Sequence, residues 1–235
     1  MAGTLYLGTS GYAYPQWTGA FYPPDLRSGK MLSHYAGRFD SVEINYTFRR
    51  EASDRTLAAW CEQTPEEFRF ALKAHASITH WLRLRDTGEL VRSFVERARR
   101  LGDRLGAILF QCPPNLRFDR DVAISFLSAL PPGVRYAMEL RHPSWDDARG
   151  LLAEHGVAWC TADVEQRPAG PPSWEPFGYL RLRRQAYGEE DLRGWADRIA
   201  DALAMGRDVY CYFKHEDAAG PTYVERTAEL VAARS

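Results

Sequence analysis

Ionisable side chains stand at the ends of several short apolar stretches in this chain of 235 residues. Glu43 lies near the end of one stretch, Lys73 ends another, and Glu139 lies near the end of a third. Carboxylates and a lysine gathered in one enclosed space shift each other's pKa values, and such shifts produce general acids and bases. The candidate catalytic residues are therefore Glu43, Lys73, Glu139 and Asp163, which ends a further stretch.

Arginine, histidine and amide side chains near the same positions suit recognition of an anion. Arg141 follows Glu139 by two positions, so both side chains lie on one face of a strand. Arginine binds carboxylate or phosphate in a bidentate manner, which predicts a phosphorylated or carboxylated small molecule as substrate. The candidate substrate-binding residues are Tyr12, Trp17, Asn45, His75, Gln111, Arg141, His142, Arg181, Arg183 and Lys214.

The residue types leave the reaction class open among hydrolase, lyase and isomerase chemistry. Glu139 or Glu43 would act as general base or acid, and Lys73 as electrophile or proton donor. A Schiff base on Lys73 would need an amine whose pKa is depressed by burial and neighbouring charge. The structural alternative is that Glu43, Lys73 and Glu139 form a buried ion network that braces the fold.

Alternating strand and helix patterns supply the elements that position these side chains. Eight such units predict an α/β protein, with a single (β/α)8 TIM-barrel domain over residues 1–235. The active site of this fold lies at the C-terminal ends of the strands. The predicted strands are 5–9, 39–45, 68–73, 105–111, 134–140, 157–163, 177–182 and 208–213.

Two connections depart from a regular strand–helix repeat. The first, residues 10–27, is long and aromatic, which predicts either a plug over the barrel mouth or a wall of Tyr12 and Trp17 that stacks on a sugar ring or base. The sixth, residues 164–176, holds four prolines and no amphipathic pattern, which predicts an irregular crossover. The candidate helix N-caps are Ser53, Thr87 and Asp119.

The composition argues against several classes of function. A formal net charge of −1 provides no overall field for nucleic acid or an anionic membrane, and the chain has no run of about 18 apolar residues that would span a bilayer. Four cysteines without a closely spaced pair predict a reduced, cytoplasmic protein, and no signal peptide is expected. The histidine spacing predicts no metal site, and no motif indicates an organic cofactor. A weakly held divalent ion and the oligomeric state stay open.

Short motifs along the chain resemble those of the YecE-like proteins, a family described as a domain of unknown function, DUF72. They are residues 8–12 (GTSGY), 17–23 (WTGAFYP), 42–45 (VEIN), 70–74 (FALKA), 78–80 (ITH), 111–114 (QCPP) and 139–142 (ELRH). The matches follow the family's order over most of the chain. The resemblance implies a TIM barrel, in agreement with the count of strand–helix units, and it implies no particular activity.

Two other functions stay open. Strand-end arginines can form a positive rim, which by analogy with barrel endonucleases describes a nucleic-acid-binding or phosphodiester-cleaving barrel. A non-catalytic scaffold that uses the barrel mouth as a binding pocket is the third possibility. The arginines of the predicted rim are Arg49, Arg50, Arg83, Arg85, Arg181, Arg183 and Arg184.

Overall fold

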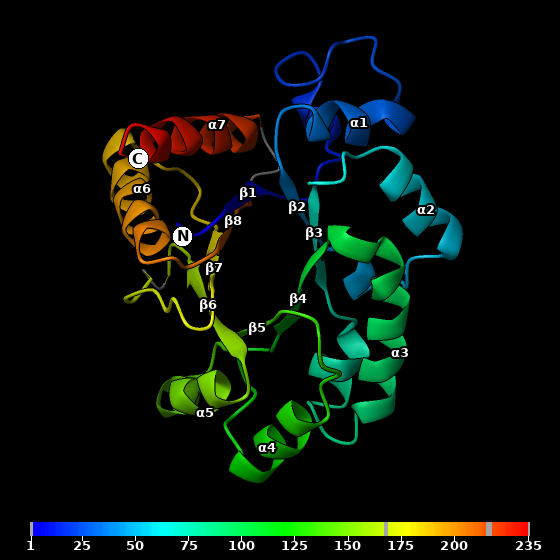
Figure 1. Ribbon diagram of the computed structural model, residues 1–235, viewed down its shortest axis with the longest axis vertical. Helices are drawn as coiled ribbons and strands as arrows, with labels where there is room; N and C mark the ends of the chain where they lie inside the picture. The colour runs from blue at the N-terminus through cyan, green and yellow to red at the C-terminus, as the bar shows by residue number, and fades with distance from the viewer. Residues whose placement is uncertain (1, 167–168, 215–217, 235) are drawn as a thin grey trace.

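Eight parallel strands close into a barrel in the order in which they follow each other along the chain (Figure 1). The structure is a computed structural model that describes residues 2–166, 169–214 and 218–234. The strands are β1 (Leu5–Ser10), β2 (Ser41–Ile44), β3 (Arg69–Lys73), β4 (Leu105–Gln111), β5 (Tyr136–Glu139), β6 (Val157–Asp163), β7 (Gly178–Leu182) and β8 (Val209–Phe213). The chain is therefore a single α/β domain with TIM-barrel architecture, as the strand–helix alternation predicts.

Helices surround the barrel on its outer side (Figure 1). The α-helices are α1 (Met31–Ala36), α2 (Asp54–Glu62), α3 (Gly88–Ala98), α4 (Arg120–Ser128), α5 (Arg149–Glu154), α6 (Glu189–Ala204) and α7 (Ala219–Ala232). Ser53 and Asp119 each accept a hydrogen bond from a backbone N–H group of the following first turn, so both are N-caps as predicted. Thr87 occupies the N-cap position of α3 as predicted, but its hydroxyl donates to the carbonyl oxygen of Leu84 and accepts no hydrogen bond from the first turn.

Large aromatic side chains from one wall of the barrel fill the space left by small side chains of the other wall. Tyr179, Tyr210 and Tyr212 enter the interior from β7 and β8, and each is at most 1% exposed. Strands β3 to β6 contribute alanines to the same interior cluster: Ala71, Ala107, Ala137 and Ala158. Because protein interiors pack to the density of organic crystals, these complementary volumes fix the strands relative to one another. Polar residues above this layer are thus held on rigid walls.

The long first connection packs beside α1 on the outside of the barrel (Figure 1). Trp17 is fully buried, and its ring lies against Phe21 and Tyr22. The prediction that Trp17 stacks on a substrate is therefore wrong, since its indole presents no face to solvent. Tyr12 is half-buried and lines a shallow pocket with Trp60 of α2, on the outer side of the barrel. The first connection is a packing element, as the plug alternative has it, but it packs beside the strands and α1.

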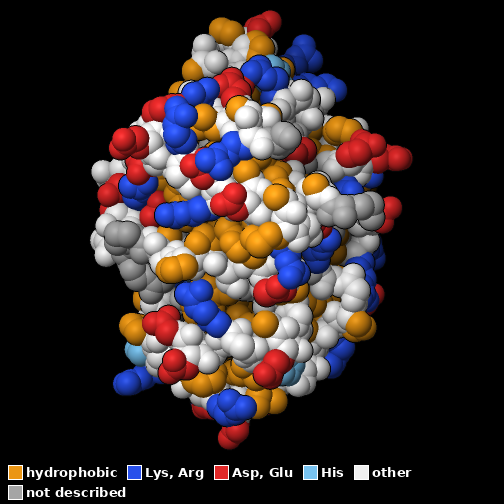
Figure 2. All heavy atoms as spheres, turned by 60° about the vertical axis from the view of Figure 1, so that its left-hand side comes forward, with side chains coloured by type: hydrophobic (Ala, Val, Ile, Leu, Met, Phe, Trp, Pro, Cys, Tyr) orange, Lys and Arg blue, Asp and Glu red, His pale blue; other side chains and the backbone are white. Residues whose placement is uncertain are grey.

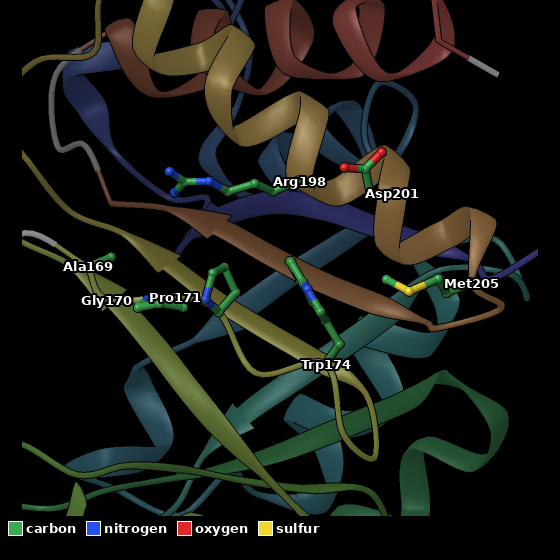
Figure 3. A pocket seen from close by; sticks show the side chains of 8 residues that line it. Ala169, Gly170, Pro171, Trp174, Arg198, Asp201 and Met205 are labelled. Atoms are coloured by element: carbon green, nitrogen blue, oxygen red, sulfur yellow. The ribbon is translucent and has the colours of Figure 1, made fainter.

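The sixth crossover reaches β7 without a helix in its described residues, as predicted from its prolines. Arg167 and Pro168 lie outside the described part. The crossover packs against α6 and encloses with it a pocket of about 440 Å³ (Figure 3). Most of this lining is apolar, with Pro171 and Trp174 on the crossover and Met205 just after α6. Arg198 and Asp201 of α6 are the ionisable residues of this lining.

The close approach of β2 requires a glycine in β1. A Cβ atom at Gly8 would lie 1.9 Å from the carbonyl oxygen of Ser41. We expect Gly8→Ala to lower the free energy of unfolding by about 3 kcal/mol, or to prevent folding, because the strands would have to separate. Urea unfolding followed by circular dichroism measures this change. Gly150→Ala is the control: this exposed position in α5 has open space around it, and the substitution should be neutral or stabilising. An equal loss in both variants would contradict the account.

Candidate active site at the barrel mouth

Five polar side chains converge inside the barrel at the C-terminal ends of the strands. Each belongs to a different strand and is at most 8% exposed: Glu43, Lys73, Gln111, Glu139 and Arg181. Alternation places them there, because residues two apart in a strand share a face. Ala71 of β3 and Tyr179 of β7 belong to the interior cluster, and Lys73 and Arg181 follow them by two positions. Strand phase therefore brings together five of the residues selected from the sequence.

Arg181 lies between the two carboxylates of the cluster. Its Nη2 donates to Glu43 Oε1 at 2.8 Å, and its Nη1 donates to Glu139 Oε2. All three side chains are at most 2% exposed. Burial alone would raise the pKa values of both carboxyls, but the charge of Arg181, together with further arginine charges and the hydrogen bonds to each carboxylate, outweighs burial and lowers the pKa of each below its usual range. Both groups are therefore carboxylates at neutral pH.

Further donors complete the hydrogen bonding of both carboxylates. Glu43 accepts hydrogen bonds from the hydroxyls of Ser10, at 2.8 Å, and Tyr179, at 2.9 Å. Glu139 accepts from Gln111 Nε2, at 2.8 Å, and from Arg141 Nε, at 2.6 Å. Buried polar groups cost free energy unless they are hydrogen-bonded, so these contacts make the cluster compatible with a dry interior.

Lys73 is the group of the cluster whose pKa lies close to neutral pH. Its Nζ donates to Gln111 Oε1 at 2.6 Å and lies 3.8 Å from the centroid of the Phe48 ring. Burial and the charge of Arg181 lower the pKa of Lys73 to about 8, although the carboxylates partly oppose this shift. The amine therefore exists in both protonation states close to neutral pH, which is what acid–base chemistry requires.

Two arginines extend the cluster toward the opening, and both are half-buried. Arg141 shares the inward face of Glu139, and Arg183 shares that of Arg181. Burial and the charge of Arg181 lower the pKa of Arg183. Within the described part of the chain, the Arg183 guanidinium forms no ion pair, and like-charged neighbours of this kind suit an anionic ligand.

Two histidines follow β3 and β5 in the same local arrangement. Nδ1 of His75 accepts a hydrogen bond from the backbone N–H of Ser77, and Nδ1 of His142 accepts one from Ser144, each at 3.2 Å. A ring nitrogen that accepts such a bond carries no proton, so the neutral ring carries its proton at Nε2. Both histidines can therefore donate a hydrogen bond through Nε2 to an acceptor such as phosphate or carboxylate.

Asp163 does not belong to the cluster. Cys160 of β6 lies in the interior cluster, whereas Trp159 packs under the helices, and Asp163 shares the face of Trp159. Its carboxylate pairs with Arg184 at 2.9 Å and accepts a hydrogen bond from the backbone N–H of Ala169. The catalytic assignment of Asp163 is therefore wrong. A position at the end of an apolar stretch does not by itself show whether the side chain faces the barrel interior or the helices. Asp163 instead anchors the sixth crossover.

Two further candidates flank the cluster. Asn45 follows β2, and its Nδ2 donates to Glu43 Oε1 at 3.3 Å. Lys214 follows β8 and is half-buried, next to residues 215–217, which lie outside the described part. A contact of either side chain with substrate stays a prediction.

Sequence analysis missed four side chains of the mouth region. Ser10 and Tyr179 could have been found by strand phase, because both lie on inward faces that the interior cluster defines. Phe48, under the Lys73 amine, and Trp81 have no comparable signal in the sequence. Trp81 is 70% exposed on the π-helix Ser77–Trp81 and stands edge-on to the His75 ring at 5.6 Å. Three residues with positive φ follow it, a strain typical of functional loops: Arg83, Leu84 and Asp86.

Within residues 2–166, 169–214 and 218–234, no group of three or more His, Cys, Asp or Glu side chains is arranged to hold a metal ion. None of the helices in these ranges has both the length and the apolar character needed to cross a bilayer.

Residues 6–235 match the family model described as "Protein of unknown function DUF72". The chain is 32% identical to UPF0759 protein YecE of Escherichia coli K12 over 143 residues, which are 60% of this chain. In this match the chain spans about half the length of YecE (50%). It is 27% identical to UPF0759 protein YunF of Bacillus subtilis, with 90% of this chain and 88% of YunF covered.

Solved structures share the fold. A DUF72 family protein of Thermotoga maritima superposes with a TM-score of 0.82 at 24% identity, covering 97% of this chain and 99% of that chain. A DUF72 family protein of Enterococcus faecalis gives 0.73 at 16% identity, covering 98% and 97%. D-allulose 3-epimerase of Methylomonas sp., solved with D-allulose, gives 0.61 at 12% identity and covers both chains fully. At these identities the likeness concerns the barrel architecture.

Replacing Arg181 should destabilise the fold, because two carboxylates would remain buried without a cation. We expect Arg181→Met to lower the free energy of unfolding by about 4 kcal/mol at pH 7. Arg183→Met is the matched control on the same strand face, and it should lower the free energy by less than about 1 kcal/mol, because no ion pair is lost. Urea denaturation of the two variants measures the difference. Equal stability of the two variants would contradict the role given to Arg181.

The carboxylate of Glu139 should make stability depend on acid pH. Its folded-state pKa lies below the usual value of 4.5, so its contribution is fully present above pH 4.5 and is lost as the pH falls further. The gap in unfolding free energy between the wild type and Glu139→Gln should therefore shrink below pH 4.5. Glu154→Gln, which removes an exposed carboxylate at the end of α5, is the control against which the gap is compared. A gap that stays constant from pH 7 to pH 3 would show that Glu139 titrates normally.

Proposed function

The chain belongs to the DUF72 family of proteins of unknown function, and we propose that this member is an enzyme that moves a proton on a small anionic molecule at the barrel mouth. The observation that carries the proposal is Lys73, a nearly buried amine, 8% exposed, whose pKa of about 8 lets it accept and donate a proton near neutral pH. An acid–base group is most effective when its pKa lies near the working pH.

In this proposal the two carboxylates hold charge and do not transfer protons. Their lowered pKa values keep Glu43 and Glu139 ionised, so they fix Arg181 between them. Glu139 also orients Gln111, whose Oε1 in turn orients the Lys73 amine. The sequence predicts an acid–base role for Glu43 or Glu139, and this proposal assigns that role to Lys73.

The charge at the mouth favours an anionic substrate. When Lys73 is protonated, four cationic side chains stand against the two carboxylates of the cluster: Lys73, Arg141, Arg181 and Arg183. Arg141 and Arg183 are half-buried, so a phosphate or carboxylate bound to them would be partly shielded from water, where its attraction to arginine is stronger. The Nε2–H groups of His75 and His142 add neutral donors for the same anion.

Proton transfer at a carbon next to a carbonyl is the reaction that this arrangement suits best. Neutral Lys73 would remove the proton, and the negative charge that develops on the carbonyl oxygen would be stabilised by the fixed cations. The shared barrel fold of D-allulose 3-epimerase supports isomerase chemistry at the level of fold analogy.

Nucleic-acid binding finds less support among the arginines of the predicted rim. Arg85 pairs with Asp119 at 2.8 Å, Arg184 pairs with Asp163, and Arg181 is buried. On the face shown in Figure 2, basic and acidic side chains are intermingled and do not form one positive patch. Binding through backbone phosphates depends on many cations left available for them.

The first test is turnover by Lys73 variants. Thermal-shift screening with phosphorylated sugars and small organic acids identifies a ligand, and conversion of that ligand is then followed against pH. We expect kcat/KM to rise with pH through about 8, because the neutral amine is the base. Lys73→Met should lower kcat/KM at least ~100-fold, the usual contribution of a general base.

A control variant and a binding variant accompany this experiment. Lys30→Met removes an exposed lysine of the short helix Ser28–Lys30 and should leave turnover unchanged. Arg141→Gln should weaken substrate binding, since it removes a cation from the mouth. Full turnover by Lys73→Met, with a folded protein confirmed by circular dichroism, would overturn the proposal.

A further inference from the structure

The end of the barrel opposite the mouth holds a concave site of about 350 Å³. It lies at the N-terminal ends of the strands: Tyr6 is the second residue of β1, Arg69 the first of β3, and Tyr210 the second of β8. Its volume is within the range of small-molecule sites, roughly 300–1,000 Å³. Its charged lining residues are three arginines and one aspartate: Arg69, Arg99, Arg135 and Asp103. This end of a TIM barrel ordinarily serves stability, so a polar pocket there needs an explanation.

A stacked tyrosine pair holds two of these arginines in place. The rings of Tyr6 and Tyr210 stack with centroids 4.5 Å apart. The Arg69 guanidinium lies 5.9 Å from the Tyr6 centroid, and the Arg135 guanidinium lies 5.9 Å from the Tyr210 centroid. Arg135 Nη1 also donates to the Tyr210 hydroxyl at 3.2 Å. Both cations are therefore positioned by the barrel itself before any ligand binds, which lowers the entropic cost of binding.

The arginines differ in how far their charge is neutralised. Arg135 pairs with Asp208 at 2.7 Å, and Arg99 pairs with Glu96 at 2.7 Å on the exposed surface. Arg69 Nη1 donates to two backbone carbonyl oxygens, and within the described residues its guanidinium has no carboxylate within 4.0 Å. Asp103, an exposed residue, also lines the pocket, so the carboxylates of this region balance the arginines in number. Arg69 is distinguished by its guanidinium, which lies inside the pocket without a carboxylate partner among the described residues.

Glycines keep the pocket open. Gly106 of β4 lies where a Cβ atom would come within 2.9 Å of the Tyr210 ring and 3.1 Å of the Arg69 side chain. Gly102 and Gly133 line the same pocket with φ of 57° and 78°, a conformation that other residues rarely adopt. Backbone without side chains therefore forms part of the wall, next to the guanidinium groups.

We propose that this pocket binds the phosphate group of a small molecule, as a site separate from the mouth. A phosphate accepts bidentate hydrogen bonds from arginine, which suits the Arg69 guanidinium, with no carboxylate partner among the described residues, and the neighbouring guanidinium groups. The interior layer of tyrosines separates this pocket from the Glu43–Arg181–Glu139 cluster. A ligand here would therefore bind without competing for the mouth, and the inference is independent of the function proposed above.

Pyrophosphate is the probe, added to 15N-labelled protein at constant ionic strength and followed by amide NMR. We expect shifts at Gly102, Gly106 and Gly133. The apparent dissociation constant at these residues should rise at least tenfold in Arg69→Gln and severalfold in Arg99→Gln. Arg99 is an exposed side chain, so this second variant tests the site even where Arg69→Gln folds poorly.

Two further variants locate the site. Arg120→Gln removes an exposed arginine at the start of α4 and should leave the affinity unchanged. Arg141→Gln alters the mouth and should likewise leave the three glycine shifts unchanged. Shifts that occur only at mouth residues, or that disappear in Arg141→Gln and persist in Arg99→Gln, would overturn the proposal. An absence of shifts at the three glycines at millimolar pyrophosphate would overturn it as well.

Discussion

Two carboxylates lie almost without solvent contact inside the barrel, and the rest of the mouth depends on the arginine between them. Removing two carboxylates from water costs far more than a hydrogen bond returns, unless a cation accompanies them. Arg181 supplies that cation, and hydroxyl and amide donors satisfy the remaining oxygen lone pairs. A bridging ion group of this kind permits one geometry, so it fixes β2, β5 and β7 relative to one another at their C-terminal ends.

The same arginine sets the chemistry of its neighbour. Lys73 is removed from water and lies in the field of Arg181 and Arg183. Burial and these positive charges lower the pKa of the amine, and the two carboxylates, which are engaged by Arg181, oppose this shift only in part. A structural ion group and a reactive lysine are therefore two consequences of one arrangement. The alternatives drawn from the sequence, a bracing network or a catalytic cluster, do not exclude each other.

Much of this site could be predicted from the sequence, because a parallel barrel converts strand phase into position. Glu43, Lys73 and Glu139 were selected by their places near strand ends, and Lys73 and Glu139 are the last residues of β3 and β5. The same reasoning failed at Asp163, whose phase puts it under the helices. It failed at Trp17 because aromatic content does not tell a packed ring from an exposed one.

Other features could not be predicted from the sequence, because they depend on contacts between residues that lie far apart along the chain or on local backbone geometry. The pairing of Arg181 with both carboxylates depends on side chains 138 and 42 residues away along the chain. The exposed position of Trp81 depends on a π-helix, and no residue pattern in the sequence predicts that helix. The arginine pocket at the other end arises where the starts of separate strands meet, and those starts carry no motif.

The most direct test is the pKa of the Lys73 amine, measured by NMR titration of protein labelled with 13C at lysine Cε. The sequence carries three lysines, Lys30, Lys73 and Lys214, so single substitutions assign each signal. The account predicts that the Lys73 signal titrates near 8, below the ordinary lysine value of about 10.4. A Lys73 signal that titrates at the ordinary value would contradict the central claim, because the amine would then remain protonated at neutral pH.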